Sequence, residues 1–313
     1  MKYPIGIQDF EDLQRNGYAY VDKTNFVYKL ADEGKYYFLS RPRRFGKSLF
    51  LSTLEAYFQG KKELFEGLAI YDLETEWKKY PIFHIDLNTA NFREKDSLYT
   101  VLNDYLTTWE SKYGTRESEA TLALRFKGVI ARAAEKEGCG VVILIDEYDK
   151  PILQTLRAPE LQAEHRAQLK AFYSVLKTQD RYIKFAFLTG VTKFGKVSVF
   201  SDLNNLTDIS MDHRYISICG MTEKELLTNF KEGIKELAEA NGDLISLKAK
   251  IETYESENKP SAIVSESFGN YSYSLATNAN GQALTWQEVF SNELKPYRKP
   301  KLFWDKRGVK EIC

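Results

Sequence analysis

The sequence predicts an α/β fold in which helices cover both faces of a mainly parallel sheet, a three-layer αβα arrangement. Two observations support this fold class. Short apolar runs, such as residues 36–40 and 182–188, alternate with longer segments in which apolar residues recur at helical spacing. The run at residues 141–145 is apolar without interruption, which is typical of a strand buried on both faces of a parallel sheet.

The composition fits one large globular domain or two smaller ones. The chain has 313 residues, of which 43% are hydrophobic, and its formal net charge is zero. A balanced charge gives no general basic surface, so any contact with DNA needs a local patch. Cys139, Cys219 and Cys313 are too widely spaced for a disulfide framework or a zinc site, and His84 is expected to be a hydrogen-bonded core histidine. With no apolar leader and no run of membrane-spanning length, a cytoplasmic protein is expected.

The predicted elements alternate along the chain. Residues 1–35 form a lead-in of short helices, in which Asp22 or Thr24 is expected to cap the second helix. Thr222 and Glu225 have the spacing of a capping box at the start of a later helix. Strands are predicted at residues 36–40, 81–87, 141–145, 182–188 and 214–219, and helices at 47–58, 97–109, 117–136, 161–176 and from 222 to a stop signal at 241–242.

The first predicted strand leads through a basic loop into a helix that begins with Gly46-Lys47-Ser48. Backbone N–H groups at a helix N-terminus point at an anion, and the helix dipole favours negative charge there. The order of strand, loop and helix therefore predicts a phosphate-binding loop. Lys47 would reach the β- and γ-phosphates of ATP, and the Ser48 hydroxyl would ligate Mg²⁺. Arg41 stands where the standard pattern has a glycine.

A second motif supports the first. The buried strand at residues 141–145 ends in Asp146-Glu147. Asp146 is predicted to hold Mg²⁺ together with Ser48, since a carboxylate at a strand end can share the metal with the loop hydroxyl. Glu147 is predicted to be the catalytic base that polarises the attacking water. Asp149 is a third acid within reach of the same site.

Other polar residues lie beside these motifs. Ligands of open α/β sheets collect at the carboxyl ends of strands, so Thr189 and Thr192 either sense the γ-phosphate or simply form a turn. Arg43 and Arg44 face the nucleotide or a partner, or else pair with acidic residues of the lead-in. The predicted nucleotide-binding residues are Arg43, Arg44, Phe45, Gly46, Lys47, Ser48, Leu49 and Thr189, with Lys47 and Glu147 as catalytic residues and Ser48 and Asp146 as metal ligands.

Residues 3–240 resemble the bacterial AAA-ATPase-like proteins, which often carry a C-terminal PD-(D/E)XK nuclease-like domain. The resemblance implies a P-loop ATPase core of the ASCE/AAA type, with Lys47 and Ser48 in Walker A and Asp146 and Glu147 in Walker B. Arg41 is usual in that family. The motifs that support the resemblance are Tyr20-Val-Asp-Lys-Thr24, Phe38-Leu-Ser-Arg-Pro-Arg-Arg-Phe-Gly-Lys-Ser48, Leu144-Ile-Asp-Glu-Tyr-Asp-Lys-Pro151, Leu188-Thr-Gly-Val-Thr-Lys-Phe194 and Phe200-Ser-Asp-Leu-Asn-Asn-Leu206.

The resemblance fades near residue 245. We therefore expect an ATPase domain at residues 1–242 and a divergent, weakly structured tail at 243–313, with the nuclease-like domain absent. Truncation or a frame shift would both give such a tail. The implied function is an ATP-binding, Mg²⁺-dependent ATPase that couples nucleotide binding or hydrolysis to a conformational change. The alternatives are a slow nucleotide-gated switch or binding module that acts on a partner protein or DNA, and a truncated remnant. No arginine finger is evident, and the protein could form an oligomer.

Overall fold

The computed structural model describes residues 2–192 and 205–240 continuously, together with four two-residue strands nearer the C-terminus. The chain divides into two compact units, residues 1–221 and 222–313, and each is described by itself. The boundary at residue 242 expected from the sequence lies inside the second unit, and that domain division stays a prediction.

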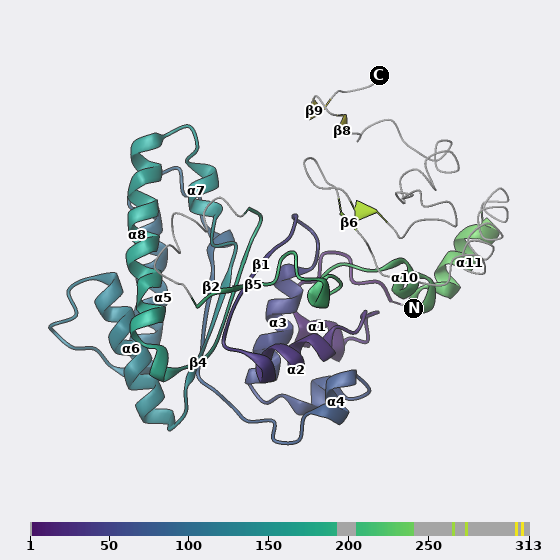
Figure 1. Ribbon diagram of the computed structural model, residues 1–313, viewed down its shortest axis with the longest axis horizontal. Coiled ribbons are helices and arrows are strands. Elements are labelled where there is room, and N and C mark those ends of the chain that lie inside the picture. The colour runs from purple at the N-terminus through teal and green to yellow at the C-terminus, as the bar shows by residue number, and fades with distance from the viewer. Residues whose placement is uncertain are drawn as a thin grey trace. The chain divides into compact units, whose positions relative to one another are not determined.

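The first unit is built on a five-stranded sheet (Figure 1). The strand order is β2-β3-β4-β1-β5, and every pairing is parallel, which confirms the predicted α/β fold. Because parallel strands end on the same side, the sheet has a carboxyl edge, where all strands end, and an amino edge, where all begin. The strands are Tyr36–Ser40 (β1), Ile82–Asp86 (β2), Val141–Asp146 (β3), Ile183–Gly190 (β4) and Thr207–Asp208 (β5).

Helices cover both faces of this sheet and complete the three layers (Figure 1). Successive side chains of a strand point to opposite faces. On β3, Val141, Ile143 and Ile145 accordingly join one hydrophobic core, and Val142 and Leu144 join the other. The first core is covered by Ser97–Tyr113 (α5), Leu122–Glu137 (α6) and Pro159–Thr178 (α8), and the second by Phe10–Arg15 (α1), Thr24–Glu33 (α2), Lys47–Phe58 (α3) and Ala69–Leu73 (α4).

Local signals fix several helix ends. Thr121 accepts a hydrogen bond from the Leu124 N–H, so α6 begins at Leu122 rather than at the expected residue 117. Helix α5 continues to Tyr113, where Gly114 follows with φ of 81°. A short helix, Lys150–Gln154 (α7), directly follows the acidic strand end.

The lead-in packs against the second core through polar contacts as well as apolar ones. The Asp22 carboxylate accepts from the Ala69 N–H at 2.7 Å, and the Thr24 hydroxyl accepts from the Ile70 N–H at 3.1 Å. Both residues therefore hold α2 against α4. Lys23 occupies the cap position without a side-chain hydrogen bond, but the Asp22 carboxylate accepts from the Thr24 N–H at 2.8 Å, so Asp22, one of the two expected residues, caps the start of α2.

The expected strand at residues 214–219 is also wrong. This segment contains a 3₁₀ turn, His213–Tyr215, followed by turns, and the sheet ends at β5. The apolar alternation arises because Tyr215, Ile218 and Cys219 are buried in the second core. The carbonyl groups of Tyr215 and Ile216 face the Arg41 guanidinium, so they do not take part in a strand ladder.

The second unit begins with the predicted capping box. The Thr222 hydroxyl accepts from the Glu225 N–H, and the Glu225 carboxylate accepts from the Thr222 N–H. Two helices, Glu223–Asn229 (α10) and Lys231–Ala240 (α11), replace the single helix expected here. The predicted weakly structured tail lies almost wholly outside the described residues. Its described strands form two antiparallel pairs, Ser265–Glu266 (β6) with Tyr273–Ser274 (β7) and Trp304–Asp305 (β8) with Gly308–Val309 (β9).

Candidate functional site

Polar residues gather at the carboxyl edge of the sheet, where the loop after β1 lies. Asp86 at the end of β2 pairs in register with Asp146 at the end of β3. Thr189, next to the end of β4, pairs in register with Leu39 of β1. The fold therefore brings the predicted phosphate loop, the predicted metal ligand and the predicted sensor to one edge.

The loop between β1 and α3 has an unusual backbone. Gly46 has φ of 83°, and Arg44 has φ of 67°. A left-handed conformation costs a non-glycine residue about 1–2 kcal/mol, so the position of Arg44 stores strain in the loop. Helix α3 begins at Lys47 directly after Gly46, and the N–H groups of its first turn have no partners within the helix. This geometry suits an anion.

Lys47 is held against its own loop. Its side chain is buried, and its ammonium donates hydrogen bonds to the carbonyl oxygens of Arg41 at 3.1 Å and Pro42 at 3.2 Å. A buried ammonium needs such acceptors because an isolated charge is costly away from water. Lys47 therefore lies within the loop and has neutral acceptors that an anion can replace.

Ser48 and Thr189 both donate to the Asp146 carboxylate. The Ser48 Oγ lies 2.5 Å from Asp146 Oδ2, and the Thr189 hydroxyl bonds to Oδ1. Mg²⁺ is usually bound by one or two protein oxygens together with phosphate oxygens and waters. Among the described residues, no three His, Cys, Asp or Glu side chains come close enough to hold a metal alone. The Ser48–Asp146 pair fits Mg²⁺ that arrives with a nucleotide.

Glu147 follows β3 in a strained conformation, with φ of 51°. Its N–H donates to Asp146 Oδ1 at 3.0 Å and to the Thr189 hydroxyl at 3.3 Å. Burial, helped by the adjacent Asp146 charge, raises the pKa of Glu147 above its ordinary value, although Lys47, Lys150 and Arg43 oppose this. Strain and a raised pKa at one residue of a charged site are features of functional groups.

The remaining predicted residues divide between the site and the scaffold. Arg43 and Arg44 are exposed, and within the described residues neither pairs with an acid of the lead-in. The Phe45 carbonyl accepts from the Gly220 N–H at 2.8 Å. Leu49 packs against the second core. Thr192 donates its hydroxyl to Asp149, so this threonine bonds to the acidic loop.

Arg41 has a structural role that no local sequence pattern indicates. Its side chain is 4% exposed, and its guanidinium donates to the carbonyl oxygens of Ser210 at 2.5 Å and Ser40 at 3.1 Å, with longer contacts to Tyr215 and Ile216. Ser40 and Ser210 are also joined by a hydrogen bond from the Ser40 N–H to the Ser210 hydroxyl. Arg41 therefore holds the start of the phosphate loop against the segment after β5.

Two side chains of β2 lie near the same edge. Burial raises the pKa of Asp86, and the Asp146 charge adds to the rise, although the Asn88 N–H bond opposes it. Asp86 could have been found from the sequence, because it is an acid at the carboxyl end of a predicted strand. His84 bonds to Glu55 at 2.7 Å, as expected of a satisfied histidine. Burial lowers the pKa of His84, but the Glu55 carboxylate outweighs this and raises it.

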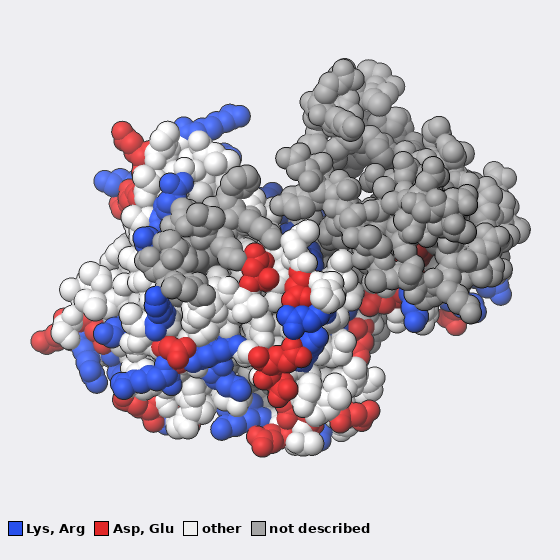
Figure 2. Space-filling model, in the orientation of Figure 1, with Lys and Arg blue, Asp and Glu red and all other residues white. Residues whose placement is uncertain are grey.

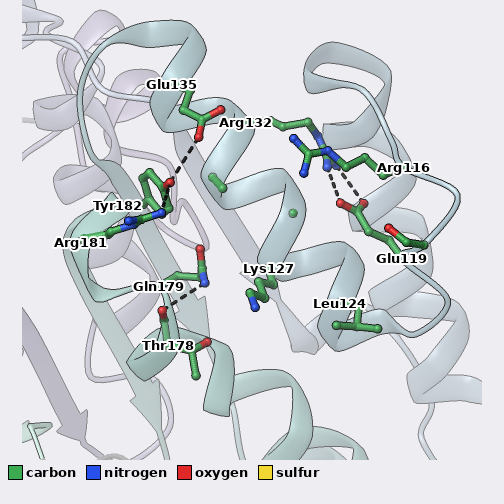
Figure 3. Close-up of a pocket in the computed structure, with 13 residues that line it drawn as sticks. Arg116, Glu119, Leu124, Lys127, Arg132, Glu135, Thr178, Gln179, Arg181 and Tyr182 are labelled. Carbon is green, nitrogen blue, oxygen red and sulfur yellow. Dashed lines mark hydrogen bonds and ion pairs between the residues drawn. The ribbon is translucent and has the colours of Figure 1, made fainter.

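A separate hollow lies beside the amino edge (Figure 3). Its volume is about 730 Å³, and its walls come from α6, the loop before it and the residues between α8 and β4. Arg132 and Glu119 pair across one wall, and Glu135 accepts from the Tyr182 hydroxyl at 3.2 Å (Figure 3). The hollow contains none of the predicted site residues.

On the face drawn in Figure 2, the basic and acidic side chains of the described residues are interspersed, and neither kind forms a large continuous patch there. This agrees with the zero net charge of the chain. Within the described ranges, every helix is too short or too polar to cross a lipid bilayer.

Comparison with known proteins assigns the chain to a family. A protein of Azotobacter chroococcum mcd 1, described as an uncharacterized protein in the vnfD 5' region, is 45% identical over 226 residues. The match covers 72% of this chain but 44% of that protein, so the chain spans less than half of its relative's length. No solved structure matches the chain. The model of the family described as "Predicted AAA-ATPase" matches residues 4–200, more than half of the sequence, and the chain therefore belongs to that family.

Proposed function

We propose that this protein is a Mg²⁺-dependent ATPase that couples nucleotide binding or hydrolysis to a conformational change. The observation that supports this best is the 2.5 Å contact between Ser48 and Asp146. Lys47 directly precedes Ser48 at the start of α3. A hydroxyl from the first turn of α3 and a carboxylate from the end of β3 meet where a phosphate-bound metal would need both. Membership of the predicted AAA-ATPase family supports the same activity.

Each side chain has a defined part in this proposal. Lys47 binds the β- and γ-phosphates, and the first-turn N–H groups of α3 orient them. Ser48 and Asp146 would hold Mg²⁺, which would neutralise charge on the phosphates. Glu147 accepts a proton from the attacking water at its carboxylate. Thr189 bonds to both Asp146 and the Glu147 N–H, so a shift in either would reach the other.

A slow, nucleotide-gated switch is the second candidate. It is favoured by the two hydrogen bonds from Lys47 to its own loop, because ATP must displace them before the ammonium can reach phosphate. The exposed Arg43 and Arg44 would then face a partner protein or DNA. An oligomer in which a second copy approaches this edge is compatible with either candidate.

The experiment is a pair of measurements on the full chain with Lys47→Ala beside it. Titration calorimetry should show Mg²⁺-dependent ATP binding that the variant loses or greatly weakens, because the charge opposite the β- and γ-phosphates is gone. Phosphate release, with and without DNA, then separates an ATPase from a slow switch. Equal ATP affinity in both proteins would contradict the phosphate-loop assignment.

A further inference from the structure

Asp149 is a buried acid that the proposed mechanism leaves without a chemical task. Its side chain is 1% exposed at the start of α7. Its carboxylate accepts hydrogen bonds from the Val191 N–H at 3.1 Å, the Thr192 N–H at 2.7 Å and the Thr192 hydroxyl at 2.8 Å. All three donors belong to the two residues that follow β4. A carboxylate with three donors is well satisfied, so Asp149 is poorly suited to act as a base.

Tyr148 forms a second set of contacts between the same two segments. Its N–H donates to the Thr189 carbonyl at 3.0 Å, and its hydroxyl donates to the Thr192 carbonyl at 2.9 Å. Gly190 allows this close approach, because a Cβ there would lie 2.4 Å from the Tyr148 ring and 3.0 Å from the Asp149 carboxylate. Residues 148–149 and 189–192 are therefore packed together as one unit.

The groups proposed to act on ATP lie at the border of this unit. Glu147 directly precedes Tyr148, and its N–H donates to the Thr189 hydroxyl. The Thr189 hydroxyl in turn bonds to Asp146. Glu147 keeps a left-handed φ of 51°, and a strained conformation persists only where the surroundings over-determine it. The contacts of Tyr148 and Asp149 with the end of β4 are the surroundings that the structure provides.

We infer that Asp149 is a positioning residue, which holds Glu147 and Thr189 in the geometry that hydrolysis requires. This inference rests on the proposed ATPase function. Asp149 does not touch the nucleotide or water in this account, and it acts only through the segment after β4. It follows that loss of Asp149 should affect the chemical step while leaving the contacts of Lys47 and Ser48 with phosphate in place.

The variant Asp149→Asn tests this directly. Its amide carries no charge and can place an oxygen at only one of the two carboxylate positions, so the Val191 N–H, which contacts both Asp149 oxygens, would face an NH₂ group at the other and the contact is weakened. We expect kcat to fall by about 10- to 100-fold, since a small misplacement of catalytic groups has effects of that size. The ATP dissociation constant should stay within about 2-fold, because the hydrogen bonds of Asp149 go to Val191 and Thr192 and not to the phosphate loop. Thr192→Val removes a single bond and should lower kcat less.

Asp180→Asn is the matched control. Asp180 lies at the amino edge, where its carboxylate bonds to Lys35 and Tyr36, so the same substitution there should not change kcat. A double variant of Asp149→Asn and Thr192→Val should show less than the product of the two separate effects, because both remove parts of one contact. A wild-type kcat in Asp149→Asn, or a loss of ATP affinity as large as the loss of kcat, would overturn the inference.

Hydrogen exchange separates this inference from the ATPase proposal. In Asp149→Asn without nucleotide, the Tyr148 amide should exchange faster than in the wild type, because the Thr189 carbonyl that accepts from it is no longer fixed. The Glu147 amide should show a smaller increase, because it donates to Asp146 as well as to Thr189. Unchanged exchange at both amides would overturn the positioning role. If the wild type releases no phosphate but the variant still shows faster exchange than the wild type, the ATPase proposal is contradicted and the positioning contact remains supported.

Discussion

At the amino edge of the sheet charged residues are paired with each other, whereas at the carboxyl edge buried charges bond mostly to neutral groups. Lys35 pairs with Asp180 at 2.8 Å, and Arg132 pairs with Glu119, all at or beside the amino edge. At the carboxyl edge, Lys47 and Arg41 donate to carbonyl groups, and Asp146 accepts from hydroxyls. A buried side-chain charge that has no oppositely charged partner in the protein can still bind an ion or ligand of opposite charge. The comparison therefore separates a scaffold from a site within one sheet.

The largest expected effect is on turnover at the carboxyl edge. Glu147→Gln keeps the shape of the side chain and removes the proton acceptor, so kcat should fall by roughly 10²- to 10⁴-fold with ATP binding retained. Phosphate release at saturating ATP measures this. Glu137→Gln, the same substitution in α6 at the amino edge, should leave kcat unchanged. Wild-type turnover in Glu147→Gln would move the base to another residue.

The next effect is on stability at the amino edge. The Arg132–Glu119 pair is largely buried, with side-chain exposures of 13% and 9%. Glu119→Ala leaves the guanidinium buried without its carboxylate and should lower the free energy of unfolding by about 3 kcal/mol. Glu137→Ala removes an exposed partner of Lys112 and should cost less than about 1 kcal/mol. Denaturant unfolding measures both losses in the free energy of unfolding. Equal losses would show that burial does not make the Arg132–Glu119 pair more important for stability than an exposed pair.

A smaller effect concerns pH. Glu147 must be ionised to accept a proton, and burial raises its pKa. Turnover should therefore rise with pH through a value above the ordinary glutamate pKa of about 4.3 and then level off. A kcat profile at saturating Mg²⁺ and ATP measures this limb. Turnover that stays constant down to the ordinary glutamate pKa would mean that the raised pKa does not govern the rate.

The smallest expected effect is on nucleotide affinity through the exposed arginines. The charge of Arg43 opposes the rise in the pKa of Glu147, so it lies near enough to act on the site, whereas Arg44 is not among the largest contributors to that pKa. Arg43→Ala should weaken ATP binding by about 5-fold, the size of a solvent-exposed charge contact of about 1 kcal/mol, and added salt should reduce the difference. Arg44→Ala is the matched control, with a weaker effect. Equal losses would show that distance to the site does not matter.

Much of the site could be predicted because parallel strands end together. Lys47 and Ser48 follow β1, Asp146 ends β3 and Thr189 lies near the end of β4. Each is marked by a short local pattern, and the fold class alone brings the patterns to one edge. The same reasoning predicts both faces of the sheet, since an uninterrupted apolar strand such as β3 must be covered twice.

The rest depends on contacts between distant segments, which a local pattern does not encode. Arg41 bonds to Ser210, which is 169 residues away along the chain, and Asp149 bonds to residues 191 and 192. The segment at 214–219 was misjudged for the same reason. Its apolar alternation is real, but the carbonyl groups of Tyr215 and Ile216 bond to Arg41, and the sheet ends at β5. Backbone strain at Glu147 also follows from these contacts and not from the residue type.

The position of Arg41 has a consequence for the motif itself. Replacing Arg41 with glycine would restore the standard pattern in letters and remove a buried cation that four carbonyl groups face. The Tyr215 carbonyl would keep the Ile218 N–H, but the Ser210 carbonyl would lose the Arg41 donor, and buried polar groups without partners are costly. The glycine of the common motif and the arginine of this chain are thus two separate solutions for starting the loop. A search that demands glycine at this position will pass over chains in which a buried arginine bonds the start of the loop to the segment after the neighbouring strand.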